Sequence, residues 1–215
     1  MLGCDKAETS VDNDKTSIHP LWLRIIHWSN AVAVIILIMS GWRIYNATRF
    51  LHLYIPGTNT RLFPNEWTLG GWLGGAIQWH FAAMWILMAN AVLYLILFLI
   101  TKRGKQFLPV TPQGLWDDIR AFVKGRLSHA DLRQYNTIQK LAYLFALADM
   151  IVLIASGLVL WKSVQFGWLR VLLGGYETAR YVHFFAMTGL CAFIVVHVVM
   201  ALLVPKTIKA MLWGR

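Results

Sequence analysis

The segment RYVHFFAMTGLCAFIVVHVVMALLV, residues 180–204, is apolar over most of its length yet contains two histidines, His183 and His197. A helix needs about 20 mainly apolar residues to cross a membrane, and this segment is long enough. Ionisable side chains inside such a span are costly and are functional candidates by default. The segment therefore predicts a membrane-spanning helix that holds two functional imidazoles.

The composition of the whole chain agrees with this environment. Of its 215 residues, 58% are hydrophobic and only 14% are charged, whereas about a quarter of the residues of a soluble domain are charged. We predict an all-α integral membrane protein: a polar tail (1–17), then a four-helix transmembrane bundle (18–215). Nothing in the sequence predicts an internal repeat. The four expected spans cover about 21–44, 79–100, 138–161 and 181–204.

Lysine and arginine are distributed unevenly between the two ends of these spans. The tail, the start of the first span, the connection 101–137, Lys140 and the C-terminal end hold 14 of the 20 basic residues, and the opposite side holds 6. Because positive charge stays with the cytoplasm, both termini are expected to be cytoplasmic in a multi-pass protein of the bacterial inner membrane. The basic residues bracket apolar spans, which indicates contact with membrane lipid and argues against nucleic-acid binding.

Two connections have a recognisable character. The connection over about 45–78 is rich in Gly, Trp and Pro and is too long to be a simple turn. It is either an interfacial cap or a docking surface for a partner outside the membrane, and the two interpretations are compatible. The inner connection predicts an amphipathic helix on the membrane surface over about 112–127.

Four histidines fall within the expected spans: His27, His80, His183 and His197. His183 and His197 are fourteen residues apart, about 40° short of four full turns, so they share a helix face and stand about 21 Å apart along the axis. The predicted topology places His27 and His197 on the inner side of the membrane. It places His80 and His183 on the outer side.

Two histidines that face each other from different helices can supply both axial ligands of a haem iron, and bundle interiors hold such cofactors. We therefore predict an inner haem held by His27 and His197 and an outer haem held by His80 and His183. Gly41, fourteen residues after His27, is expected to give the outer haem ring room. Zinc is a poorer use of these histidines, since two ligands leave a zinc site incomplete.

Several stretches then resemble a known family. HPLWLRIIHWSNAVAVIILIMSGWRI (19–44), QWHF (78–81), YNTIQKLAYLFAL (135–147) and LLGGYETARYVHFFAMTGLCAFIVVHV (172–198) are similar to bacterial di-haem cytochromes b. This is the cytochrome b561 and nickel-hydrogenase cytochrome b family, and the likeness is nearest to its thiosulfate-reductase branch. It covers about residues 18–205, and the four histidines fall on the family's ligand positions.

The resemblance implies two non-covalent haems b and a role in electron transfer between the quinone pool and a periplasmic redox subunit. That subunit would be molybdopterin-oxidoreductase-like or hydrogenase-like and would dock on the 45–78 loop. Two alternatives remain: a stand-alone superoxide:quinone oxidoreductase, and a non-redox scaffold or transporter in which the histidines only bridge helices.

Further candidates lie near the ends of the spans. Arg24 and Arg180 each precede a histidine by three residues and are possible partners of haem propionates, although snorkelling to the interface explains them equally well. A quinone site is possible at the inner end of the third span, where the alternative is an interfacial anchor; its residues are Gln139, Lys140 and Tyr143.

Asp149 stands apart from these candidates because it lies in the middle of the third span. It is interpreted either as a proton-relay group or as a carboxyl hydrogen-bonded within the bundle.

Overall fold

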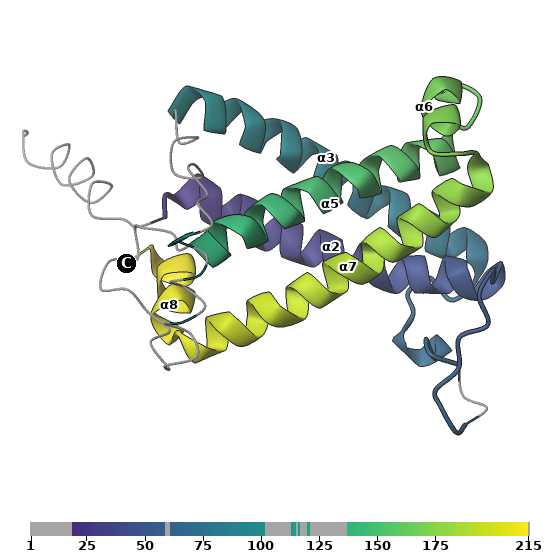
Figure 1. Ribbon diagram of the computed structural model, residues 1–215, viewed down its shortest axis with the longest axis horizontal. Helices are drawn as coiled ribbons and strands as arrows, with labels where there is room; N and C mark the ends of the chain where they lie inside the picture. Colours follow the sequence, from purple (N-terminus) through teal and green to yellow (C-terminus); the bar gives the residue numbers. More distant parts are fainter. Residues whose placement is uncertain are drawn as a thin grey trace, which may run out of the picture. The chain divides into compact units, whose positions relative to one another are not determined.

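The computed structural model describes residues 19–58, 61–101, 113, 114, 116, 120 and 137–214. In these residues the chain is helical, without a strand, and has one isolated β-bridge between Tyr54 and Arg61 (Figure 1). The elements are α2 (Leu21–Ala47), the 3-10 helix η1 (Asn65–Trp67), α3 (Leu73–Thr101), α5 (Thr137–Trp161), α6 (Gly167–Leu172), α7 (Tyr176–Leu203) and α8 (Pro205–Trp213).

The four expected spans are confirmed. The helices α2, α3, α5 and α7 are each long and apolar enough to cross a membrane. A spanning segment must satisfy its backbone hydrogen bonds internally, which a continuous helix does. Two helices begin earlier than predicted: α3 starts at Leu73 and α7 at Tyr176, because the hydropathy windows did not count the Gly-containing and polar first turns.

The chain divides into two compact units, which are described separately. In the first unit, α2 packs along α3. The amide of Asn90 on α3 donates to Ser29 Oγ at 2.7 Å and to Asn30 Oδ1 at 2.8 Å on α2. Farther along, Ser40 of α2 contacts His80 of α3. The residue numbers run in opposite directions along the contact, so α2 and α3 form an antiparallel hairpin.

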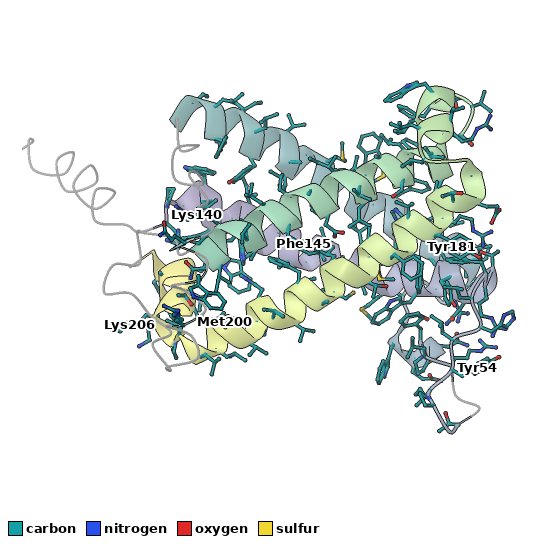
Figure 2. All side chains as sticks on the ribbon, viewed as in Figure 1. Tyr54, Lys140, Phe145, Tyr181, Met200 and Lys206 are labelled. Atoms are coloured by element: carbon teal, nitrogen blue, oxygen red, sulfur yellow. The ribbon has the colours of Figure 1, made fainter. Side chains whose placement is uncertain are left out.

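In the second unit, α5 packs along α7, with α6 in the connection between them (Figure 1). The rings of Phe145 and Phe193 lie 6.5 Å apart between centroids. Lys140 and Met200 lie at one end of this helix pair and Tyr181 lies at the other (Figure 2). This pair is also an antiparallel hairpin.

The two hairpins carry a short internal repeat, so the expectation of none is wrong. Residues 35–41, IILIMSG, match residues 151–157, IVLIASG, at five of seven positions. Residues 80–84, HFAAM, match residues 183–187, HFFAM, at four of five. In each hairpin the first motif lies on the first helix and the second motif lies on the second helix.

The connection between α2 and α3 folds back on the end of α2. Phe63 stacks on Trp42 with a centroid distance of 4.8 Å, and its carbonyl oxygen accepts a bond from Asn46 at 2.8 Å. Arg43 donates to the carbonyl oxygen of Gly71. The connection is therefore tied to α2 by side chains from its last two turns, while Trp67 and Trp72 stay exposed, as is typical of an interfacial aromatic belt.

The structure describes only part of the segments that were predicted on the cytoplasmic side. The tail 1–17 lies outside the described residues, as does most of the amphipathic helix expected over 112–127. Its described residues, Gln113, Gly114, Trp116 and Arg120, are helical, and the Arg120 guanidinium lies 5.3 Å from the centroid of the Trp116 ring. The helix α8 was not predicted from the sequence; it begins at Pro205, a residue that fits the first turn of a helix but not its interior.

Candidate haem-binding site

His80 of α3 is held by the opposite helix of its own hairpin. Its Nδ1 lies 3.0 Å from Ser40 Oγ, and that oxygen lies 2.6 Å from the carbonyl oxygen of Ile36. A carbonyl oxygen only accepts, so the hydroxyl proton of Ser40 points to Ile36 and the Oγ accepts from His80. His80 therefore carries its proton on Nδ1, which makes Nε2 the nitrogen with the lone pair that could ligate a metal.

His183 of α7 is held in the same way in the second hairpin. Its Nδ1 lies 3.0 Å from Ser156 Oγ, which is 2.6 Å from the carbonyl oxygen of Val152. The carbonyl oxygen of Leu153 also lies 3.1 Å from this Nδ1. Because that oxygen cannot donate, the proton of His183 is on Nδ1 here too, and Nε2 is again the nitrogen that could ligate a metal.

A glycine follows each serine and makes room for the imidazole. A Cβ built on Gly41 would be 3.6 Å from Cε1 of His80, and one built on Gly157 would be 3.3 Å from Cε1 of His183. Gly41 thus lies next to His80, the histidine predicted to hold the outer haem; that it gives the haem ring room stays a prediction. The group that its missing side chain admits is the ring of His80.

The other two histidines lie toward the opposite ends of the hairpins. His27 is thirteen residues before Ser40 on α2, and His197 is fourteen residues after His183 on α7, which correspond to about 20 Å and 21 Å along the helix axes. The ring of His27 meets Trp28 edge-on at 5.2 Å, and the ring of His197 stacks on Phe193 at 5.7 Å. Each hairpin therefore presents one imidazole near each end, with matching separations.

This donor set fits haem better than a bare metal ion. Among the described residues, no three or more His, Cys, Asp or Glu side chains gather as a metal-ion site needs. Two imidazoles per iron are sufficient for a haem with two axial histidines. The imidazoles of His80 and His183 are each hydrogen-bonded through Nδ1, and a bond at that nitrogen fixes the orientation of an imidazole that ligates a metal through Nε2.

The arginine candidates have distinct surroundings. Arg24 is half-buried on α2, one turn before His27. Arg180 pairs with Glu177 on α7 at 2.8 Å, and the Glu177 side chain is 67% exposed. A propionate at Arg180 would share its guanidinium with that exposed carboxylate. The propionate role of both arginines stays a prediction.

The quinone candidates Gln139, Lys140 and Tyr143 fall in the first two turns of α5. Gln139 and Tyr143 are exposed, and Lys140 is half-buried. Their place at a helix end, with polar groups next to an apolar surface, is compatible with quinone binding and with interfacial anchoring, so this site also stays a prediction.

Asp149 of α5 faces α7 at Gly189. A Cβ on Gly189 would be 3.4 Å from Asp149 Oδ1. The other carboxyl oxygen, Oδ2, is buried and has no hydrogen-bond partner in the part of the chain that the structure describes. The structure thus gives no support to the interpretation that this oxygen is hydrogen-bonded between the helices.

Sequence reasoning missed Ser40, Ser156 and Gly157. The signal that could have found them is the repeated Ser-Gly pair within IILIMSG and IVLIASG, because a pair that recurs in two spans at the depth of a histidine marks a shared local structure.

Comparison with known proteins identifies the family. The model of the prokaryotic cytochrome b561 family matches residues 18–214. A relative from Azospira oryzae, named "Putative protein-methionine-sulfoxide reductase subunit YedZ1", is 55% identical over 200 residues, which are 93% of this chain and 97% of that protein. That name indicates a methionine-sulfoxide reductase, not a thiosulfate reductase, so the finer branch assignment gains no support. No solved structure matches the chain. The chain belongs to the prokaryotic cytochrome b561 family, as a haem-b electron-transfer protein that crosses the bacterial cytoplasmic membrane several times.

Proposed function

We propose that the chain holds two haems b and carries electrons between membrane quinol and a catalytic subunit on the periplasmic side. His80 and His183 would ligate the outer haem, and His27 and His197 the inner one. The observation that carries this proposal is the equivalence of the two hairpins. Each supplies an imidazole with its Nδ1 bonded to a buried serine. Each also supplies a second imidazole about 20 Å away along the helix axis.

Haem b supplies a one-electron ferric/ferrous couple when it is bound. The chain supplies the axial nitrogens, the apolar surroundings and the separation between the centres. The aromatic rings next to the inner pair, Trp28 and Phe193, offer flat apolar surfaces on which a porphyrin can pack. None of these groups makes or breaks a covalent bond of the substrate.

The partner class follows from the relative, whose name denotes a subunit of a protein-methionine-sulfoxide reductase. We infer that the partner of this chain is a reductase subunit of that kind and that electrons flow from quinol to it. Oxidation of one quinol releases two electrons and two protons. Reduction of one sulfoxide to a thioether and water consumes the same number of each, so the two half-reactions balance.

The docking surface would be the connection between α2 and α3. It is long, it is fixed to α2 through Asn46 and Arg43, and it exposes Trp67 and Trp72. Exposed tryptophans on a fixed loop suit both the membrane interface and a protein contact.

The superoxide alternative depends on outer cations that are available to attract an anion. Of the six cations predicted on that side, Arg43 donates to Gly71, Arg180 pairs with Glu177, and the Lys162 ammonium lies 5.2 Å from the ring centroid of Trp161. Arg49 also donates to the hydroxyl of Tyr54, at 3.5 Å. Four of the six cations are thus engaged, which leaves the partner-subunit function better supported.

The test is a count of haems in the purified full-length protein and in double variants, by pyridine haemochrome and a reduced-minus-oxidised spectrum. The wild type should hold two haems b per chain. The variant H80A/H183A should keep one haem, because both changes strike the same centre. H27A/H80A should keep none.

Other outcomes have defined meanings. If H80A/H183A loses both haems while H27A/H80A keeps one, the pairing is wrong. A colourless wild type would support the scaffold alternative, and quinone reduction by superoxide without a partner would support the oxidoreductase alternative. H52A, which changes an exposed loop histidine, is the matched control and should keep two haems.

A further inference from the structure

The two serines that contact histidines are fully buried inside spanning helices. Ser40 and Ser156 each have 0% of their surface exposed. Burying a hydroxyl in an apolar environment is unfavourable unless it is hydrogen-bonded. Each of these hydroxyls donates to the carbonyl four residues earlier, at 2.6 Å, and this bond alone would satisfy its proton. The acceptor side of each oxygen therefore remains available to the imidazole.

The arrangement occurs twice, once in each copy of the internal repeat. The His80–Ser40 pair joins residues 40 positions apart, and the His183–Ser156 pair joins residues 27 positions apart. Both Nδ1–Oγ distances are 3.0 Å, and both serines precede the glycine that the imidazole packs against. Because the same serine–histidine hydrogen bond is kept in both hairpins, we interpret it as a contact with a function.

We propose that Ser40 and Ser156 are positioning residues that orient the outer-haem ligands and lower the midpoint potential of that haem. The inference rests on the proposed function, which makes His80 and His183 ligands of one iron. A serine oxygen that accepts from Nδ1–H holds the ring in one tautomer and one plane and increases the basicity of Nε2. A more basic ligand stabilises the ferric state over the ferrous state, which lowers the potential.

The two positions differ in one respect that sharpens the test. Nδ1 of His183 lies 3.1 Å from the carbonyl oxygen of Leu153 as well as 3.0 Å from Ser156. That carbonyl remains when Ser156 is replaced by alanine, so the tautomer of His183 stays fixed. S156A should therefore change the basicity of Nε2 of His183 more than the orientation of its ring.

The experiment is a redox titration of S40A, S156A and the double variant, as purified full-length holoprotein, followed by optical and electron paramagnetic resonance spectroscopy. Each variant should keep two haems. One midpoint potential should rise and the other should stay unchanged. The rise is expected to reach at most about a tenfold change in the ferric/ferrous ratio, which is about 59 mV for a one-electron couple, and it should be larger in the double variant. The low-field resonance of the same haem should shift in S40A if the imidazole plane rotates.

T188V is the matched control. The Thr188 hydroxyl donates to the carbonyl of Phe184, four residues earlier, at 3.0 Å; the change removes that bond and leaves both serines intact. T188V should leave both potentials unchanged. If S40A loses a haem outright, S40T decides the cause: recovery of the haem and of the wild-type potential supports the inference, and loss in both variants overturns it.

The failure of this inference is distinguishable from the failure of the proposed function. Unchanged potentials in S40A/S156A, together with two haems in the wild type and one in H80A/H183A, overturn the serine role alone. Two haems in H80A/H183A would show that His80 and His183 are not the ligands of the outer haem. The proposed role of Ser40 and Ser156 would then be wrong as well.

Discussion

Gly157 on α5 lies against the imidazole of His183 on α7 so closely that an added Cβ would be 3.3 Å from Cε1 of the ring. The equivalent distance between Gly41 on α2 and His80 on α3 is 3.6 Å, which is ordinary van der Waals contact. In both hairpins a glycine leaves room for an imidazole, but Gly157 leaves less room than Gly41. Alanine substitutions can measure this difference.

Replacing Gly157 with alanine should disturb His183 more than replacing Gly41 with alanine disturbs His80. The methyl group in G157A must push the ring of His183 or separate the helices, and overpacking of this kind costs about 1–3 kcal/mol. G41A should be close to the wild type. Thermal unfolding and haem content of the two purified variants check this ranking, and equal behaviour would contradict the steric argument.

Replacing Asn90 with alanine should loosen the first hairpin. Its amide bonds to Ser29 and Asn30 at 2.7 Å and 2.8 Å are two hydrogen bonds that cross between α2 and α3. Interhelical hydrogen bonds in membranes contribute about 0.6 kcal/mol on average and about 1.7 at most. N90A should lower the unfolding midpoint in an SDS titration, whereas T188V, which removes a bond within one helix, should not. Equal midpoints would show that the amide contributes nothing.

The spans were predictable because the signal for them is local. Hydropathy over about 20 residues reports whether a segment can cross a membrane, and four such windows occur in this sequence. The depths of the histidines follow from their places in those windows. The bonds of Ser40 and Ser156 were not predictable in this way, because each joins residues that are distant in the chain and close only after the hairpin forms.

Two other misses have different physical reasons. The helix α8 has only nine residues, so it gives too short a periodic signal to separate from the end of the fourth span. The packing of the first connection depends on Phe63, which reaches back to Trp42 over a turn-rich stretch. An aromatic residue in a loop does not reveal its partner until the backbone path is known.

The anchored connection should resist proteolysis until its bonds to α2 are removed. R43A/N46A deletes the side-chain bonds to Gly71 and Phe63 and should speed trypsin cleavage at Arg49 or Arg61 without changing haem content. T58A is the control within the same loop, since the Thr58 hydroxyl donates to the carbonyl of Ile55, three residues earlier, at 3.0 Å. The assay uses spheroplasts, which expose the periplasmic face. Cleavage seen only in inverted vesicles would mean that the predicted orientation is wrong.

Asp149 supports a prediction about proton movement. Its Oδ2 is buried in a spanning helix with no hydrogen-bond partner among the described residues, and an unpaired buried polar atom lowers stability. A carboxyl retained at such a cost is a functional candidate. D149N keeps the shape of the side chain but removes the proton-carrying carboxyl. It should keep both haems and slow haem reduction by quinol about 100-fold or more, the usual contribution of a positioned acid or base.

The control for this prediction is G189A. Its methyl group would be 3.4 Å from Asp149 Oδ1, an ordinary contact, and the carboxyl stays in place, so haem reduction should proceed at nearly the wild-type rate. Stopped-flow reduction of the haems by a quinol analogue measures both variants, with thermal unfolding as the second readout. A wild-type rate in D149N together with a lower unfolding temperature would identify Asp149 as a structural group, because only the relay interpretation requires the carboxyl proton.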